Sequence, residues 1–159
     1  MRAAAAGAAG ALAAHARSLC TTRSTLPWGH RRSAAVGLSC LAFCAPALVD
    51  RSAPARWPLQ ACVSLMSDHF RTGLPSGWHV ADRWLASANV LAQLARARRA
   101  LPAWQAAVLA ATPLCAKLRA STCAARRDYA AYRRWHVAWH VLAALAALLV
   151  ELAHAARPA

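Results

Sequence analysis

Acidic residues are scarce in this chain. Only five aspartates and glutamates stand against nineteen lysines and arginines in 159 residues, a formal net charge of +14. Charged residues of both signs make up 15% of the chain and hydrophobic residues 59%, whereas a soluble domain usually has about 25% charged residues. The bases lie in clusters between apolar runs, as in the loops of membrane proteins, rather than along one face as nucleic-acid binding would require. We therefore expect a membrane protein with no nucleic-acid partner.

Cysteine pairs of the kind that bind structural zinc are also missing. The six cysteines form no CxxC pair and no zinc-finger spacing. Cys40 and Cys44 lie four residues apart inside an apolar run, so the prediction for them is small buried hydrophobic side chains.

The N-terminal segment, residues 1–33, contains no acid and is rich in Ala, Ser, Thr and Arg. This composition is typical of an organellar transit peptide. The alternatives are a disordered basic tail and a signal peptide with a weak apolar core. We expect a targeting or disordered segment, and an organelle or endomembrane as the location.

The remaining chain, residues 34–156, is predicted to form one transmembrane helical domain. A bilayer crossing takes roughly 17–25 apolar residues, and Pro, Gly and Arg mark the connections. The prediction is an all-α, multi-pass transmembrane bundle of about five helices. The five apolar segments are 34–49, 58–71, 78–96, 101–116 and 135–156, and the connection at 117–134 is either a loop or a helical extension of the last segment.

Polar residues inside three of these segments recur at helical spacing. A polar group facing lipid at mid-bilayer costs on the order of 2–3 kcal/mol, so the polar stripes should face one another. If the segments cross alternately, the end of the second and the starts of the third and fifth share one side of the membrane. The stripes are Gln60, Ser64, Asp68 and Arg71; His79, Asp82, Asn89 and Gln93; and His136, His140, Glu151 and His154.

The fifth segment begins with the motif WHVAWH, which places His136 and His140 one helical turn apart. Two histidines and a carboxylate form a known ligand set of catalytic zinc, so His136, His140 and Asp68 are the candidate metal ligands. Asp82 is the candidate general base, or it orients a ligand histidine. Ser64 is placed to hydrogen-bond the attacking water or the oxyanion. At the depth of the lipid headgroups, the available carbonyl is that of a lipid amide or ester.

Several of these residues have a structural alternative. His69 and His79 are expected to be loop or interface histidines. Asp82 can form a local ion pair with Arg83, and Asp68 can form one with Arg71. Glu151 and His154 are expected to pair with each other at i, i+3.

Three motifs resemble one superfamily of membrane proteins. SLMSDHF, WHVADRWLA and HVAWHVLAALA, in that order, resemble sequences of the alkaline ceramidases, the adiponectin/progestin-type receptors and the myomaker-like proteins. Ser64 matches the serine of that superfamily, Asp82 its aspartate, and His136 and His140 its final histidine pair. The resemblance implies a zinc ion held by histidines and hydrolysis of a lipid amide, although some members are receptors or fusion factors.

The chain departs from the superfamily in two respects. Asp68 stands where the first histidine is expected, with His69 one position away, and there are about five spans instead of seven. The leading hypothesis is a ceramidase-like, zinc-dependent membrane hydrolase that acts on a lipid amide. The alternatives are a non-catalytic membrane protein, structural or receptor-like, with or without a metal, and a haem-binding bundle using His136 and His79.

Overall fold

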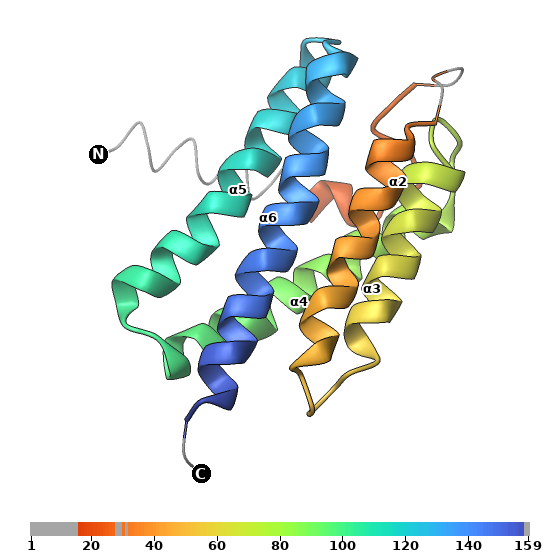
Figure 1. Ribbon diagram of the computed structural model, residues 1–159. Helices are drawn as coiled ribbons and strands as arrows, with labels where there is room; N and C mark the ends of the chain where they lie inside the picture. Colours follow the sequence, from red (N-terminus) through yellow and green to blue (C-terminus); the bar gives the residue numbers. More distant parts are fainter. Residues whose placement is uncertain (1–15, 28–29, 31, 158–159) are drawn as a thin grey trace.

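The computed structural model describes residues 16–27, 30 and 32–157. All regular structure in this part of the chain is helical, which confirms the all-α prediction. With the labels of Figure 1, the elements are α2 (Ala34–Cys40), the 3₁₀ helix η1 (Leu41–Leu48), α3 (Arg56–Leu65), the π-helical turn η2 (Met66–Phe70), α4 (Gly77–Ala100), α5 (Ala103–Ala125) and α6 (Tyr129–Ala155).

Local sequence signals set the helix ends. Ser33 and Ser76 cap α2 and α4, because their side chains accept the backbone N–H groups of Val36 and Trp78. Asp128 caps α6 in the same way by accepting the N–H of Ala131. Only three residues separate α5 from α6, so the connection predicted at 117–134 is helical over most of its length and extends both neighbouring helices.

The helices run alternately between two ends of the bundle. The start of α2 lies near η2, since Nδ1 of His69 is 3.1 Å from the carbonyl oxygen of Ser33. The loop after η1 lies near the end of α6, where Arg56 bridges Asp50 and Glu151. We call these the Asp68 end and the Asp50 end, at the top and bottom of Figure 1.

Small residues let the helices approach closely. Ala116 and Ala120 are buried on α5, and Ala144 and Ala147 are buried on α6. These two helices lie side by side along much of their length, while α4 runs obliquely behind them (Figure 1). The core between η1, α3 and α6 is completed by larger side chains, including Phe43.

Part of the N-terminal segment packs against the helices. Leu26 is buried in a cluster with Tyr132 of α6. Arg83 of α4 donates hydrogen bonds to the carbonyl oxygens of Ser18, Thr21 and Arg23. Other parts of the predicted targeting segment, residues 1–15, 28–29 and 31, lie outside the described residues.

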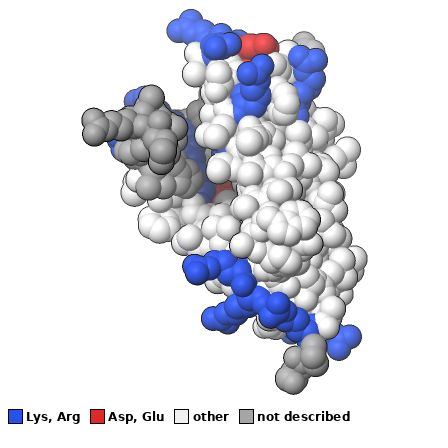
Figure 2. Space-filling view, turned by 90° about the vertical axis from the view of Figure 1, so that its left-hand side faces the viewer, with Lys and Arg blue, Asp and Glu red and all other residues white. Residues whose placement is uncertain are grey.

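The helices turn apolar side chains outward. On α6, polar His136, His140 and Glu151 are buried, while large aliphatic side chains at intervals of four, four and three residues are exposed: Val141, Leu145, Leu149 and Leu152. In the described chain, α6 is the one helix long and apolar enough to cross a membrane, and Ala34–Leu48 is apolar but shorter. The face drawn in Figure 2 has Lys and Arg gathered at its two ends and mostly uncharged side chains between them.

Candidate metal centre

Asp68 lies against the histidine pair of α6. Its Oδ2 atom is 2.9 Å from Nε2 of His136 and 3.4 Å from Nε2 of His140. The two imidazole ring centroids are 4.5 Å apart. Asp68 belongs to the π-helical turn η2, a feature often found at functional sites in helices. The three side chains named as metal ligands from the sequence are therefore brought to one point.

The second nitrogen of His140 fixes the proton on its ring. Nδ1 is 2.9 Å from Oγ of Ser39. The Ser39 hydroxyl donates to the carbonyl oxygen of Val36 at 2.7 Å, which uses its only proton. Nδ1 of His140 must then be the donor to Ser39, so Nε2 directs a lone pair at the Asp68 carboxylate. A cation between these two electron-rich atoms, either a proton or a metal ion, would remove their repulsion.

A third type of donor lies beside this pair. Cys40 of α2 is completely buried, and its ligand atom and those of Asp68 and His140 all lie within 4.8 Å of one another. The sulfur is 3.7 Å from Nδ1 of His140. Cys40 was predicted to be a small buried hydrophobic residue, because its apolar segment gave no sign of chemistry.

The donor atoms are of kinds that bind divalent metal ions. Two nitrogen or oxygen ligands of one tetrahedral zinc lie about 3.3 Å apart, close to the 2.9 and 3.4 Å measured from Asp68 to the histidines. Both histidines are buried, and imidazole, carboxylate and thiolate are all groups that bind zinc. The cluster of Cys40, Asp68 and His140 can therefore hold a metal ion, with His136 in contact with the same carboxylate.

Ser64 and Asp82 form a second polar pair nearby. The Ser64 hydroxyl donates to Oδ1 of Asp82 at 2.5 Å. Gln60 donates to the same oxygen at 3.0 Å and to Ser64 at 2.9 Å, and its own oxygen accepts from Asn89 at 3.0 Å. The polar stripes predicted on the second and third segments therefore face each other, and Asp82 bonds to Ser64 and Gln60 rather than to Arg83.

His69 and His79 both lie away from the ligands. His69 contacts Ser33, and its ring lies beneath Gly37, where an added Cβ would be 2.9 Å from Nδ1. His79 lies in the first turn of α4 and is buried. Its Nε2 lies 2.9 Å from the carbonyl oxygen of Leu74 and its Nδ1 lies 2.8 Å from Ser67. Both nitrogens of His79 are engaged, which leaves none for a haem iron.

The i, i+3 spacing of Glu151 and His154 predicted an ion pair between them, but Glu151 has other partners. It accepts hydrogen bonds from Arg56, Gln93 and Arg96. Asp50 pairs with the same two arginines, at 2.8 Å and 3.3 Å. Two carboxylates and two guanidinium groups thus form a neutral cluster that ties η1, α3, α4 and α6 together at the Asp50 end.

The Asp50 carboxyl is strongly stabilised in its charged form. Burial alone would raise its pKa, but hydrogen bonds from Ser52 and Ala53 and the charges of Arg96 and Arg56 outweigh burial and lower the pKa to about 2. Asp50 lies in the loop between η1 and α3, on no helix. Asp50 is therefore ionised at all physiological pH values.

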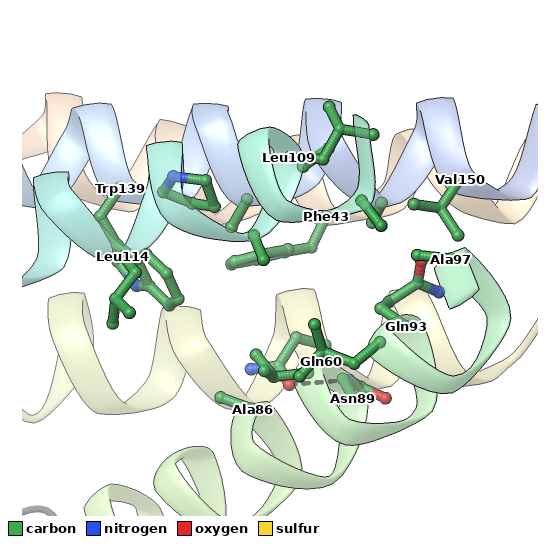
Figure 3. A pocket seen from close by; sticks show the side chains of 18 of the residues that line it. Phe43, Gln60, Ala86, Asn89, Gln93, Ala97, Leu109, Leu114, Trp139 and Val150 are labelled. Atoms are coloured by element: carbon green, nitrogen blue, oxygen red, sulfur yellow. Dashed lines mark hydrogen bonds between the residues drawn. The ribbon is translucent and has the colours of Figure 1, made fainter. Parts of the chain in front are cut away.

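An apolar cavity of about 200 Å³ lies among the helices on the Asp50 side of the metal-ligand cluster. Leu109, Trp139 and Val150 face Gln60 and Asn89 across it (Figure 3). Phe43 lines the cavity and also contacts the ring of His140, with ring centroids 5.4 Å apart. Gln60 thus connects the cavity wall to the pair of Ser64 and Asp82, and Phe43 connects it to His140.

Comparison of the chain with protein-family models, with curated proteins and with solved structures finds no match.

Proposed function

We propose that the chain is a multi-pass integral membrane protein of about five crossings. The proposal is supported by large apolar side chains exposed on successive helices, for example Leu41 on η1, Leu91 on α4, Val108 on α5 and Leu145 on α6. Soluble monomers rarely expose so much contiguous apolar surface. Most of the charge on the face in Figure 2 lies at its two ends, while polar groups such as Gln60 are buried inside. This distribution suits a lipid environment around the middle of the bundle.

We further propose that the buried cluster binds zinc and that the protein hydrolyses a lipid amide, as a shortened member of the superfamily its motifs resemble. The observation that carries this proposal is the contact of Asp68 with both His136 and His140. A carboxylate in the place of the superfamily's first histidine preserves a zinc ligand set of two imidazoles and one carboxylate.

The roles of the surrounding residues follow from their contacts. Zinc supplies a Lewis acid that activates water and polarises a carbonyl group. Asp82 takes the proton of the attacking water; its hydrogen bonds from Ser64 and Gln60 both end on Oδ1, which orients Oδ2 as the proton acceptor. Ser64 positions this carboxylate and lies within reach of the oxyanion. The apolar cavity beside Gln60 accommodates part of an acyl chain, which favours a fatty-acid amide as substrate.

The test is hydrolysis of a fluorescent N-acyl lipid by the zinc-loaded full-length protein in nanodiscs. Asp82→Asn should lower turnover by at least about 100-fold while the zinc content stays unchanged. Asp128→Asn is the matched control, because Asp128 is exposed at the N-cap of α6 and asparagine caps a helix equally well. Zinc-loaded wild-type protein that releases no fatty acid, or an Asp82→Asn variant with full turnover, would contradict the hydrolase proposal.

A non-catalytic membrane protein with a structural metal is the second candidate. The position of Cys40 favours it, because a fourth protein donor is typical of structural zinc sites. In that case the zinc-loaded protein has no hydrolase activity, and a chelator lowers its melting temperature.

A further inference from the structure

We infer that the thiolate of Cys40 is a direct ligand of the metal held by Asp68, His136 and His140, and that it controls access of water to that metal. This inference rests on the metal site of the proposed function. The ligand atoms of Cys40, Asp68 and His140 lie within 4.8 Å of one another. Three different elements, α2, η2 and α6, therefore contribute to one cluster.

The sulfur of Cys40 is available for coordination. Cys40 is a free cysteine with no exposed surface. Its polar contacts are a weak hydrogen bond to the carbonyl oxygen of Val36 at 3.3 Å and an approach of 3.7 Å to Nδ1 of His140, the ring nitrogen that also contacts Ser39. Cys44, the next cysteine along the chain, is exposed and does not belong to the cluster. The two cysteines of this apolar segment thus have different surroundings despite their helical spacing.

The distances allow a tetrahedral site after a small movement. With a zinc–sulfur bond of about 2.3 Å and zinc–nitrogen bonds of about 2.0 Å, the sulfur and a nitrogen ligand lie about 3.6 Å apart. The separations in the cluster reach at most 4.8 Å. Rotation of side chains by roughly 1 Å is enough to bring Cys40, Asp68 and His140 within bonding distance of one ion, and His136 joins them through its contact with Asp68.

Charge balance favours the thiolate. Two neutral imidazoles and one carboxylate leave a divalent cation with a net charge of +1 inside a buried site. A thiolate brings the total to zero, which lowers the cost of placing the site in a medium of low dielectric constant. A soft sulfur ligand also favours zinc over magnesium or calcium.

Four protein ligands fill a tetrahedral coordination sphere. Water then reaches the metal only when the bond to Cys40 breaks, and Asp82 accepts the proton that the entering water loses. The bound and released states of Cys40 thus set the fraction of protein that is ready to react. Cys40→Ala should leave metal binding intact and increase the rate of lipid-amide hydrolysis.

The test uses the full-length protein loaded with Co²⁺, whose absorption spectrum reports its ligands. We expect visible bands of tetrahedral cobalt together with an intense sulfur-to-cobalt charge-transfer band in the near ultraviolet. The charge-transfer band should be lost in Cys40→Ser and retained in the control Cys44→Ser. On wild-type protein loaded with zinc, X-ray absorption should find one sulfur at about 2.3 Å, a measurement that needs no variant.

The outcomes separate this inference from the proposed function. Tetrahedral cobalt bands without a charge-transfer band, together with no sulfur near zinc, would overturn the role of Cys40 and leave the histidine–aspartate site standing. Failure of the protein to bind either metal would overturn both. A charge-transfer band that survives in Cys40→Ser would assign the sulfur to another cysteine and overturn the inference alone.

Discussion

Oδ2 of Asp68 lies 2.9 Å from Nε2 of His136, although 68 positions separate the two residues in the chain. The same oxygen is 3.4 Å from His140. One carboxylate on η2 is thus joined to two imidazoles on the last helix, and the folding of the whole bundle is needed to create this contact. If these three side chains hold zinc, each of them should be indispensable for binding it.

The identity of the third ligand can be tested on two adjacent residues. Asp68→Ala should lower zinc affinity by more than about 100-fold, because it removes the carboxylate that contacts both histidines. His69→Ala should retain zinc, since His69 contacts Ser33 instead. Competition with a chromogenic chelator measures both affinities. Loss of zinc in His69→Ala with retention in Asp68→Ala would show that the ligand assignment is reversed.

Two glycines give a matched test of packing around η2. Gly37→Ala should destabilise the protein by about 1–3 kcal/mol, because the new Cβ would meet the ring of His69 at 2.9–3.0 Å. Gly77→Ala should be neutral or stabilising by up to about 1 kcal/mol, because open space surrounds that position at the start of α4. Thermal unfolding in one detergent compares the two variants. Equal stability of both would contradict the contact between α2 and η2.

The cluster at the Asp50 end predicts a pH dependence of stability. The folded-state pKa of Asp50 is lowered to about 2. At pH values above the ordinary aspartate pKa of about 4, the charged carboxylate therefore stabilises the fold by about 2 kcal/mol. This stabilisation is lost as the pH falls from about 4 toward 2. Asp50→Asn should therefore be less stable than wild type at pH 7, and the difference should shrink below pH 4. Melting temperatures measured across this range provide the check. A difference that stays constant with pH would argue against the charged pairing.

Sequence alone was sufficient for the helices and for much of the site. Apolar runs with Pro, Gly and Arg between them located the helical segments, and alternation of direction placed Asp68, Asp82 and His136 at one end. The facing polar stripes were also predictable, because an unpaired polar group is costly wherever water is excluded. The facing stripes meet where Gln60 hydrogen-bonds to Ser64 and Asp82.

Contacts made only by tertiary structure were not predictable. Cys40 and Ser39 sit in an apolar run with no polar stripe, so only their position beside His140 reveals a role. Glu151 had a plausible local partner at i+3, but two arginines on other helices lie closer to its carboxylate. Spacing along one helix cannot rank a local partner against a distant one.

Membrane topology offers a further prediction. More of the described exposed arginines lie at the Asp68 end, among them Arg119, Arg126 and Arg134, than at the Asp50 end, among them Arg51 and Arg99. By the positive-inside rule, the Asp68 end faces the cytosol or its organellar equivalent. Single cysteines introduced as Arg126→Cys and Arg99→Cys, with the other exposed cysteines replaced, should react with an impermeant maleimide from opposite sides of sealed vesicles. Reaction of both from the same side would contradict five crossings.

The central claim, a zinc ion bound by Asp68 and the histidine pair of α6, is tested most directly by the metal content of the purified full-length protein. Elemental analysis should find close to one zinc per chain in the wild type and in the control His154→Ala, whose side chain is exposed near the end of the same helix. His136→Ala and His140→Ala should each contain almost none. Zinc-free wild-type protein with an intact fold, or a His140→Ala variant that keeps its zinc, would contradict the account.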